Sequence, residues 1–112
     1  MLIESEIEKI LSVGISLEPI GLSSFALTRP QAVEALSHLR DGGVGILGGD
    51  VLQYQSGRLL HNYSSWYCNP TEGESILAFV NRSGLAALEY IQNYPSNDVF
   101  FVIVPRSVLD AD

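Results

Sequence analysis

Residues 99–104, VFFVIV, are the most apolar and β-branched stretch of this chain. Valine, isoleucine and phenylalanine favour the pleated, half-buried surface of a sheet, so we expect a central strand here. Pro105 is predicted to end this strand, because proline cannot donate to a ladder of backbone hydrogen bonds. A break at residues 95–98, PSND, separates the strand from the segment before it.

Amphipathic spacing predicts three helices, over residues 3–13, from Thr28 to Gly42-Gly43, and from Ser83 to about Tyr94. The second helix has the clearest start, because Thr28 and Gln31 have the spacing of a capping box. Ser83 is expected to cap the third helix. Residues 15–27 mix apolar positions with proline, glycine and serine, and we interpret them as a loop with a short helical turn or strand.

Further strands are predicted at residues 44–47, 51–54, 59–63 and 76–80, although a helix also fits the last of these short runs. Gly48-Gly49 is expected to interrupt the first segment, as a bulge or tight turn would. Residues 55–57, QSG, predict the turn of a hairpin. Residues 64–73, SSWYCNPTEG, are interpreted as a polar and aromatic loop.

The order helix, helix, strands, helix, strand predicts an α+β fold. We expect a mainly antiparallel sheet of about four strands, with three helices packed mostly on one face. The 112 residues suit one domain with one core, over residues 1–112. A hydrophobic fraction of 46% with 17% charged residues argues against disorder.

The chain is acidic, with 13 Asp and Glu against 6 Lys and Arg and a formal net charge of −7. Such a surface repels phosphate backbones, so we expect no nucleic-acid partner. Two interpretations of the charge stay open: it keeps a small domain soluble, or it matches and steers a basic partner.

No apolar run is long enough to span a membrane, and no membrane partner is expected. The first ten residues, MLIESEIEKI, carry acids where a secretory signal would carry bases. We therefore expect a cytoplasmic protein.

Catalytic and metal-binding patterns are weak. The single cysteine, Cys68, excludes an internal disulfide and a multi-cysteine zinc site. His61 lies seven residues before Cys68, but no third residue at a recognisable spacing would orient such a pair. A structural role for Cys68 is the simpler interpretation. We expect no catalytic residue, no metal and no cofactor.

An aromatic patch with an acidic rim is the best functional feature of the sequence. Tyrosine and tryptophan anchor protein interfaces because they combine a large contact area with a polar tip. The alternative is that these rings close the core at one end of the sheet, above all Trp66. The predicted partner-binding residues are Asp50, Tyr54, Tyr63, Trp66, Tyr67, Glu72 and Glu74.

The chain resembles a known group of proteins over roughly residues 28–104. The similarity rests on Gly48-Gly49-Asp50-Val51, Asn62, Ser65-Trp66-Tyr67-Cys68, the helix from Ser83 to Tyr90-Ile91, and the strand 100–104. These features are similar to those of small α+β bacterial immunity proteins of polymorphic or contact-dependent toxin systems. The resemblance implies a cytoplasmic protein that binds one toxin domain, one-to-one, and neutralises it. Such toxins are commonly nucleases with basic clefts.

Two other classes stay open on the residues alone. One is a small enzyme that uses Cys68 or a carboxylate. The other is a regulatory or ligand-binding domain that forms a homo-oligomer through VFFVIV or the aromatic patch. An enzyme would act on a substrate without a second protein, whereas an immunity protein would be inert alone.

Overall fold

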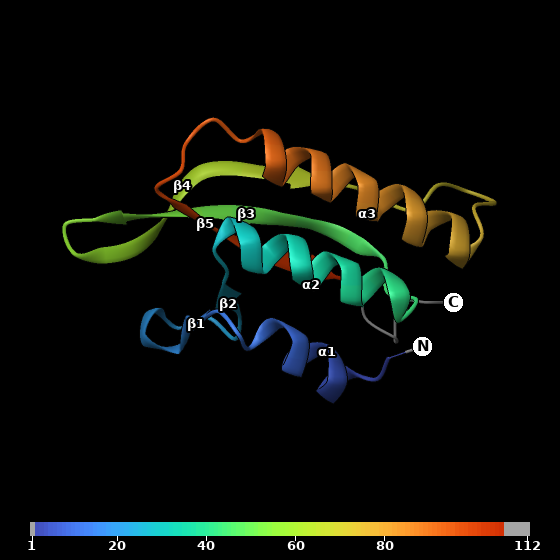
Figure 1. Cartoon of the computed structure of the whole chain (residues 1–112), viewed down its shortest axis with the longest axis horizontal. Coiled ribbons are helices and arrows are strands. Elements are labelled where there is room, and N and C mark those ends of the chain that lie inside the picture. The colour runs from blue at the N-terminus through green and yellow to red at the C-terminus, as the bar shows by residue number, and fades with distance from the viewer. Residues whose placement is uncertain (1, 107–112) are drawn as a thin grey trace.

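A three-stranded antiparallel sheet in the order β4-β3-β5 organises the protein, for which a computed structural model describes residues 2–106 (Figure 1). The strands are β3 (Ile46–Gln55), β4 (Arg58–Tyr67) and β5 (Val99–Pro105). The central strand is therefore β3, and the expectation that residues 99–104 are central is wrong. On the other side of β5, the backbone pairing among the described residues is one isolated bridge to Leu27, whose N–H and carbonyl both bond to Phe101 across 2.8 Å.

Two helices, α2 (Arg29–Asp41) and α3 (Ile76–Asn93), lie side by side across one face of this sheet, and α1 (Glu4–Leu11) lies alongside α2 (Figure 1). A two-stranded antiparallel sheet of β1 (Ile15–Ser16) and β2 (Phe25–Ala26) brackets the 3₁₀ turn η1 (Glu18–Ile20). The α+β prediction is confirmed, and the described part of the chain holds five strands in two sheets. No helix within residues 2–106 is long and apolar enough to cross a membrane.

The glycine pair does not interrupt β3, which continues through Gly48-Gly49 as one strand of ten residues. The expected bulge is present as a register shift between Ile46 and Gly48 in the pairing with β5. Gly49 lies directly opposite Trp66, and a Cβ atom there would lie 2.2 Å from the indole ring. A side chain at position 49 would therefore clash with the indole ring, so the packing of Trp66 requires glycine there.

Two predictions for residues 64–83 are wrong, namely a loop that starts at residue 64 and a third helix that Ser83 caps. Residues 64–67 continue β4 rather than starting a loop, because residues 65–67 pair with residues 48–50 of β3. Residues 76–80 form the start of α3, which is the helical alternative left open for this run, and Ser75 caps the helix by accepting the N–H of Ala78 across 3.1 Å. Ser83 is buried inside α3, where its hydroxyl accepts the N–H of Ile46 across 2.9 Å.

The local predictions for α2 are confirmed. Thr28 and Gln31 form the expected capping box, and Gly42 follows the last residue of the helix. The helix predicted to reach about Tyr94 ends at Asn93, with Tyr94 as its C-cap. These signals depend on residues a few positions apart, so tertiary contacts do not override them.

The core is divided between the two faces of the sheet. Between sheet and helices lie buried residues that include Leu27, Leu39, Val51, Ile91 and Phe101. On the opposite face, near the β3–β4 hairpin, the β1–β2 segment covers a smaller cluster of Leu17, Ala26, Leu52, Leu59 and Val102.

Candidate functional site

Exposed polar and aromatic side chains occupy the part of the sheet that the β1–β2 segment leaves uncovered. Side chains alternate along a strand, so Asp50 lies on the same face as Leu52, away from the helices. Ser65 and Tyr67 of β4 pair with Asp50 and Gly48, which places them on that face too. We call this surface, formed by Asp50, His61, Tyr63, Ser65 and Tyr67, the open sheet face.

Asp50 and His61 form a hydrogen-bonded pair on the open sheet face, with 3.1 Å between Oδ1 and Nε2. The backbone N–H of Tyr63 points at Nδ1 of His61 across 2.7 Å. Nδ1 must accept that hydrogen bond, so the proton of a neutral ring lies on Nε2 and is donated to Asp50. The pair therefore holds the carboxyl group of Asp50 at the surface and fixes the imidazole between two partners.

A bulge in β4 projects Tyr63 into solvent. Asp50 pairs with Ser65 and Leu52 pairs with His61, so three residues of β4 lie opposite Val51 alone. Tyr63 has a φ of 70°, a left-handed conformation that is unfavourable for a bulky side chain. Its side chain is 94% exposed, and its ring centroid lies 6.0 Å from that of His61. Bulges of this kind commonly re-aim a side chain at a functional surface.

Tyr67 is the second exposed aromatic side chain of the open sheet face, at 81% exposure. It comes from the last residue of β4, and its hydroxyl lies 3.5 Å from the hydroxyl of Ser65. A strand holds it in place, so little backbone entropy would be lost if a partner covered it. Tyr54 lies on the same side of β3 but four residues from Asp50, about 13 Å along the strand.

Trp66 lies on the other side of the sheet, in the core. Its side chain is 7% exposed and stacks on Tyr90, with 4.7 Å between ring centroids. The indole Nε1 is buried and has no hydrogen-bond partner within residues 2–106. Burial also raises the pKa of Tyr90. The structure thus places Trp66 in the core, the alternative that the sequence left open.

Glu74 is engaged in an ion pair that fastens the loop before α3. Its carboxylate accepts hydrogen bonds from Nε and a second guanidinium nitrogen of Arg82, both at 2.8 Å, and from the N–H of Thr71 at 3.0 Å. Hydrogen bonding to Arg82 lowers the pKa of Glu74 to about 2. The same guanidinium also donates to the carbonyl of Asn69 and to Sγ of Cys68. Glu72, in the same loop, is exposed.

Cys68 is a free and buried cysteine, held beside Arg82 with 3.2 Å between Sγ and a guanidinium nitrogen. Burial and the hydrogen bond from Arg82 therefore favour a structural role for the thiol. Within residues 2–106, no three His, Cys, Asp or Glu side chains gather as metal ligands would.

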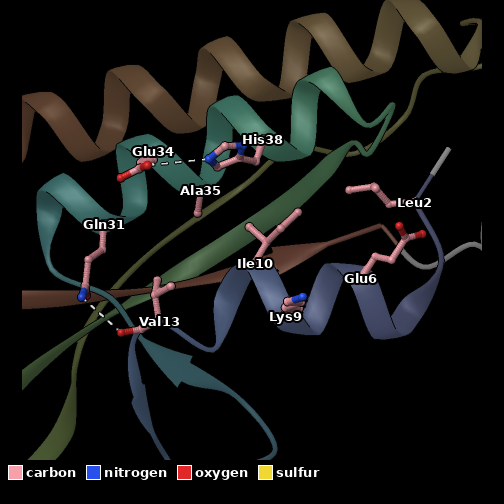
Figure 2. Close-up of a pocket in the computed structure, with 9 residues that line it drawn as sticks. All are labelled: Leu2, Glu6, Lys9, Ile10, Val13, Gln31, Glu34, Ala35 and His38. Atoms are coloured by element: carbon pink, nitrogen blue, oxygen red, sulfur yellow. Dashed lines mark hydrogen bonds and ion pairs between the residues drawn. The ribbon is translucent and has the colours of Figure 1, made fainter.

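A groove of about 650 Å³ lies between α1 and α2 (Figure 2). Figure 2 shows Ile10 and Ala35 inside it, with Glu34 and His38 joined across 3.7 Å on the α2 side. The lining mixes apolar, acidic and basic side chains, so it selects no particular charge. The lining residues are Leu2, Glu6, Lys9, Ile10, Val13, Gln31, Glu34, Ala35 and His38.

Comparison with known proteins identifies one family. The family model described as immunity protein 40 matches residues 16–105, which is most of the chain and includes every strand but the first residue of β1. No curated protein matches the sequence.

Proposed function

The chain belongs to the immunity protein 40 family, and from this premise we propose that it binds one cognate bacterial toxin domain, one-to-one, through the open sheet face and thereby neutralises the toxin. The observation that carries this proposal is the pair of exposed tyrosines on a rigid sheet. Tyr63 and Tyr67 are 94% and 81% exposed on the same face as the carboxyl group of Asp50. Tyrosine is one of the side chains enriched among the residues that contribute most to binding at protein interfaces.

The charge of the chain supports a basic toxin, most simply a nuclease. An enzyme that cleaves nucleic acid needs a positive cleft to hold phosphates. A chain with a net charge of −7 would be attracted to such a cleft, and Asp50 would lie where the tyrosines make contact. Tyr54 and Glu72, both exposed, are proposed to contact the toxin at the edge of the same interface. The protein acts in the cytoplasm, on this proposal, without a nucleic-acid or membrane partner.

Blocking by binding needs no chemistry from the immunity protein itself. We propose no catalytic role for any side chain, because the one thiol, Cys68, is buried and bonded to Arg82. Glu74 and Trp66 are proposed to act through the fold rather than by contact. Glu74 binds Arg82, and Trp66 fills the space above Gly49.

The direct test uses the toxin domain encoded by the neighbouring gene. Isothermal titration should give one binding site, and Tyr67→Ala and Tyr63→Ala should each weaken binding by about 2 kcal/mol, roughly thirtyfold. Leu22→Ala is the matched control, because Leu22 is an exposed apolar side chain outside the open sheet face. Full affinity in both tyrosine variants would contradict the proposed surface, and no binding by the wild-type protein would contradict the proposed function.

A further inference from the structure

Hydrogen bonds on both sides of the sheet hold the bulge of β4 in place. On the helix side, the hydroxyl of Tyr94 accepts from Nδ2 of Asn62 across 2.9 Å and donates to Oγ of Ser64 across 3.1 Å. On the open sheet face, the N–H of Tyr63 donates to Nδ1 of His61 across 2.7 Å. A left-handed φ at a bulky residue persists where neighbouring groups fix it. These bonds therefore hold Tyr63 in the conformation that projects its ring into solvent.

The bond between His61 and Tyr63 repeats a local motif that the next residue also forms. Oδ1 of Asn62 accepts the N–H of Ser64, two residues later, across 3.0 Å. Both acceptor atoms are bonded directly to Cγ of their side chain, so they occupy equivalent positions. The amide oxygen of an asparagine accepts at any ordinary pH, whereas a histidine nitrogen accepts only while it carries no proton. The bond from Tyr63 to His61 is thus the one that acidification can break.

The imidazole of His61 meets two ionisable groups, one from each strand of the hairpin. Asp50 of β3 lies 3.1 Å from Nε2, and the ring centroid of Tyr63, from β4, lies 6.0 Å from that of the imidazole. Within residues 2–106 the imidazole makes no other hydrogen bond or ion pair. Protonation of Nδ1 would keep the contact with Asp50 but would turn an acceptor into a donor that faces the N–H of Tyr63. Two donors cannot bond, so the bulge would lose its attachment on the open sheet face.

We propose that His61 positions Tyr63 for the toxin, and that protonation of the His61 imidazole weakens binding by releasing Tyr63. The inference rests on the proposed function, because Tyr63 is a toxin contact only under that proposal. A released tyrosine must be ordered again when the toxin binds, and this ordering costs affinity. The imidazole is 41% exposed, so protons from solvent reach it.

Two substitutions separate the two hydrogen bonds of the imidazole. In His61→Asn the amide oxygen is attached to Cγ as Nδ1 is, so the N–H of Tyr63 keeps an acceptor that does not titrate. In His61→Gln the amide nitrogen reaches the place of Nε2, so Asp50 keeps a donor while Tyr63 loses its acceptor. At about pH 8, His61→Gln should weaken toxin binding about fivefold, and His61→Asn should change it by less than about twofold.

Isothermal titration with the toxin domain between about pH 8 and pH 5 measures the pH dependence. Over this range the affinity of the wild type should fall by about fivefold relative to that of His61→Asn. The comparison cancels protonation of the toxin and of His38, the other histidine of the chain, because both proteins are titrated with the same toxin and both contain His38. Equal pH dependence in the two proteins, or full affinity in His61→Gln, would overturn the proposal.

Hydrogen exchange of the Tyr63 amide, followed by nuclear magnetic resonance of the free protein, tests the positioning step without a toxin. Protection of this amide should be equal in the wild type and His61→Asn at about pH 8, and about fivefold smaller in the wild type at about pH 5. Equal protection at both pH values would overturn the positioning role. A wild-type protein that binds no toxin at any pH would contradict the proposed function and with it the effect on binding, whereas the amide measurement would still decide whether His61 positions Tyr63.

Discussion

The guanidinium group of Arg29, the first residue of α2, donates a hydrogen bond across 3.0 Å to the carbonyl oxygen of Tyr94, just beyond the end of α3. The last carbonyls of a helix have no partners within it. Arg29 donates hydrogen bonds to several of these carbonyl oxygens, and its positive charge lies at the negative end of the α3 dipole. The other carbonyls that accept from Arg29 belong to Ile91, Gln92 and Ser96.

Removing this side chain should destabilise the protein strongly. Hydrogen bonds from a charged donor contribute about 1.5–3 kcal/mol each, so we expect Arg29→Ala to lower the free energy of unfolding by about 3 kcal/mol or more. Arg29→Lys should recover only part of this, because an ammonium group cannot fork between several carbonyls. Urea unfolding measures both, with Arg58→Ala at the exposed hairpin as control. A loss in Arg29→Ala no larger than in Arg58→Ala would contradict the prediction.

The Glu74–Arg82 pair predicts how stability depends on pH. The pKa of Glu74 in the folded protein is about 2, below its ordinary value of 4.5, because of the hydrogen bonds from Arg82 and Thr71. The unfolded chain therefore binds a proton first as the pH falls. The stabilisation is complete above pH 4.5 and is lost progressively between about pH 4.5 and pH 2.

Thermal unfolding of Glu74→Gln between pH 7 and pH 2 tests this dependence. The variant should be less stable than the wild type at pH 7, and the difference should shrink as the pH falls through this range. Glu72→Gln is the matched control, since Glu72 is an exposed carboxylate in the same loop. A constant difference between Glu74→Gln and the wild type at every pH would be inconsistent with a lowered pKa.

Trp66 should matter for folding rather than for contact with a partner. Truncation of a large buried aromatic side chain destabilises a protein by about 3–5 kcal/mol, and we expect this for Trp66→Ala. Trp66→Phe should be much milder, because the indole N–H that it removes has no partner within the described residues. Chemical unfolding measures the loss, and toxin titration of the folded Trp66→Phe protein should show unchanged affinity. A stable Trp66→Ala protein with weakened binding would instead make Trp66 an anchor.

Local signals in the sequence predicted the parts of the fold that local interactions determine. The capping box of Thr28 and Gln31 needs only residues three apart, and it forms as expected. The strand content of residues 64–67 was missed, because it depends on pairing with Gly48-Gly49, and the space that Gly49 leaves for Trp66 is a tertiary contact. Arg29 was missed for the same reason, since its partners lie more than 60 residues away.

In the candidate site, too, the sequence predicted what depends on residue type and missed what depends on tertiary contacts. Aromatic and acidic side chains pointed to residues 50–74 as a functional region. Which side chains share a face depends on the strand register and on the bulge that places His61, rather than Tyr63, opposite Leu52. No periodicity in the sequence specifies that shift. Trp66 and Tyr67 are adjacent in the sequence and lie on opposite faces of the sheet, one buried and one exposed.

Cys68→Ser should leave toxin neutralisation intact. The thiol is buried and accepts a hydrogen bond from Arg82, a contact that a serine hydroxyl can also make. Protection of a toxin-expressing strain measures the outcome, and the wild type and variant should protect to within a small factor. Loss of protection by a folded Cys68→Ser protein would revive the possibility of an enzyme that uses Cys68.

Asp50→Asn separates the charge of the open sheet face from its shape. The amide oxygen of asparagine can still accept the Nε2–H of His61, so the unfolding temperature should stay close to that of the wild type. The association rate with a basic toxin should fall and should depend less steeply on salt, because one steering charge is gone. Stopped-flow mixing at about 0.01 M and 0.15 M ionic strength compares weak and physiological screening.

Glu8→Gln, on the exposed side of α1, removes one equal charge elsewhere and should change the rate less. Equal effects of the two variants would mean that net charge alone steers the toxin, and an unchanged rate in Asp50→Asn with a lower unfolding temperature would give Asp50 a structural role only.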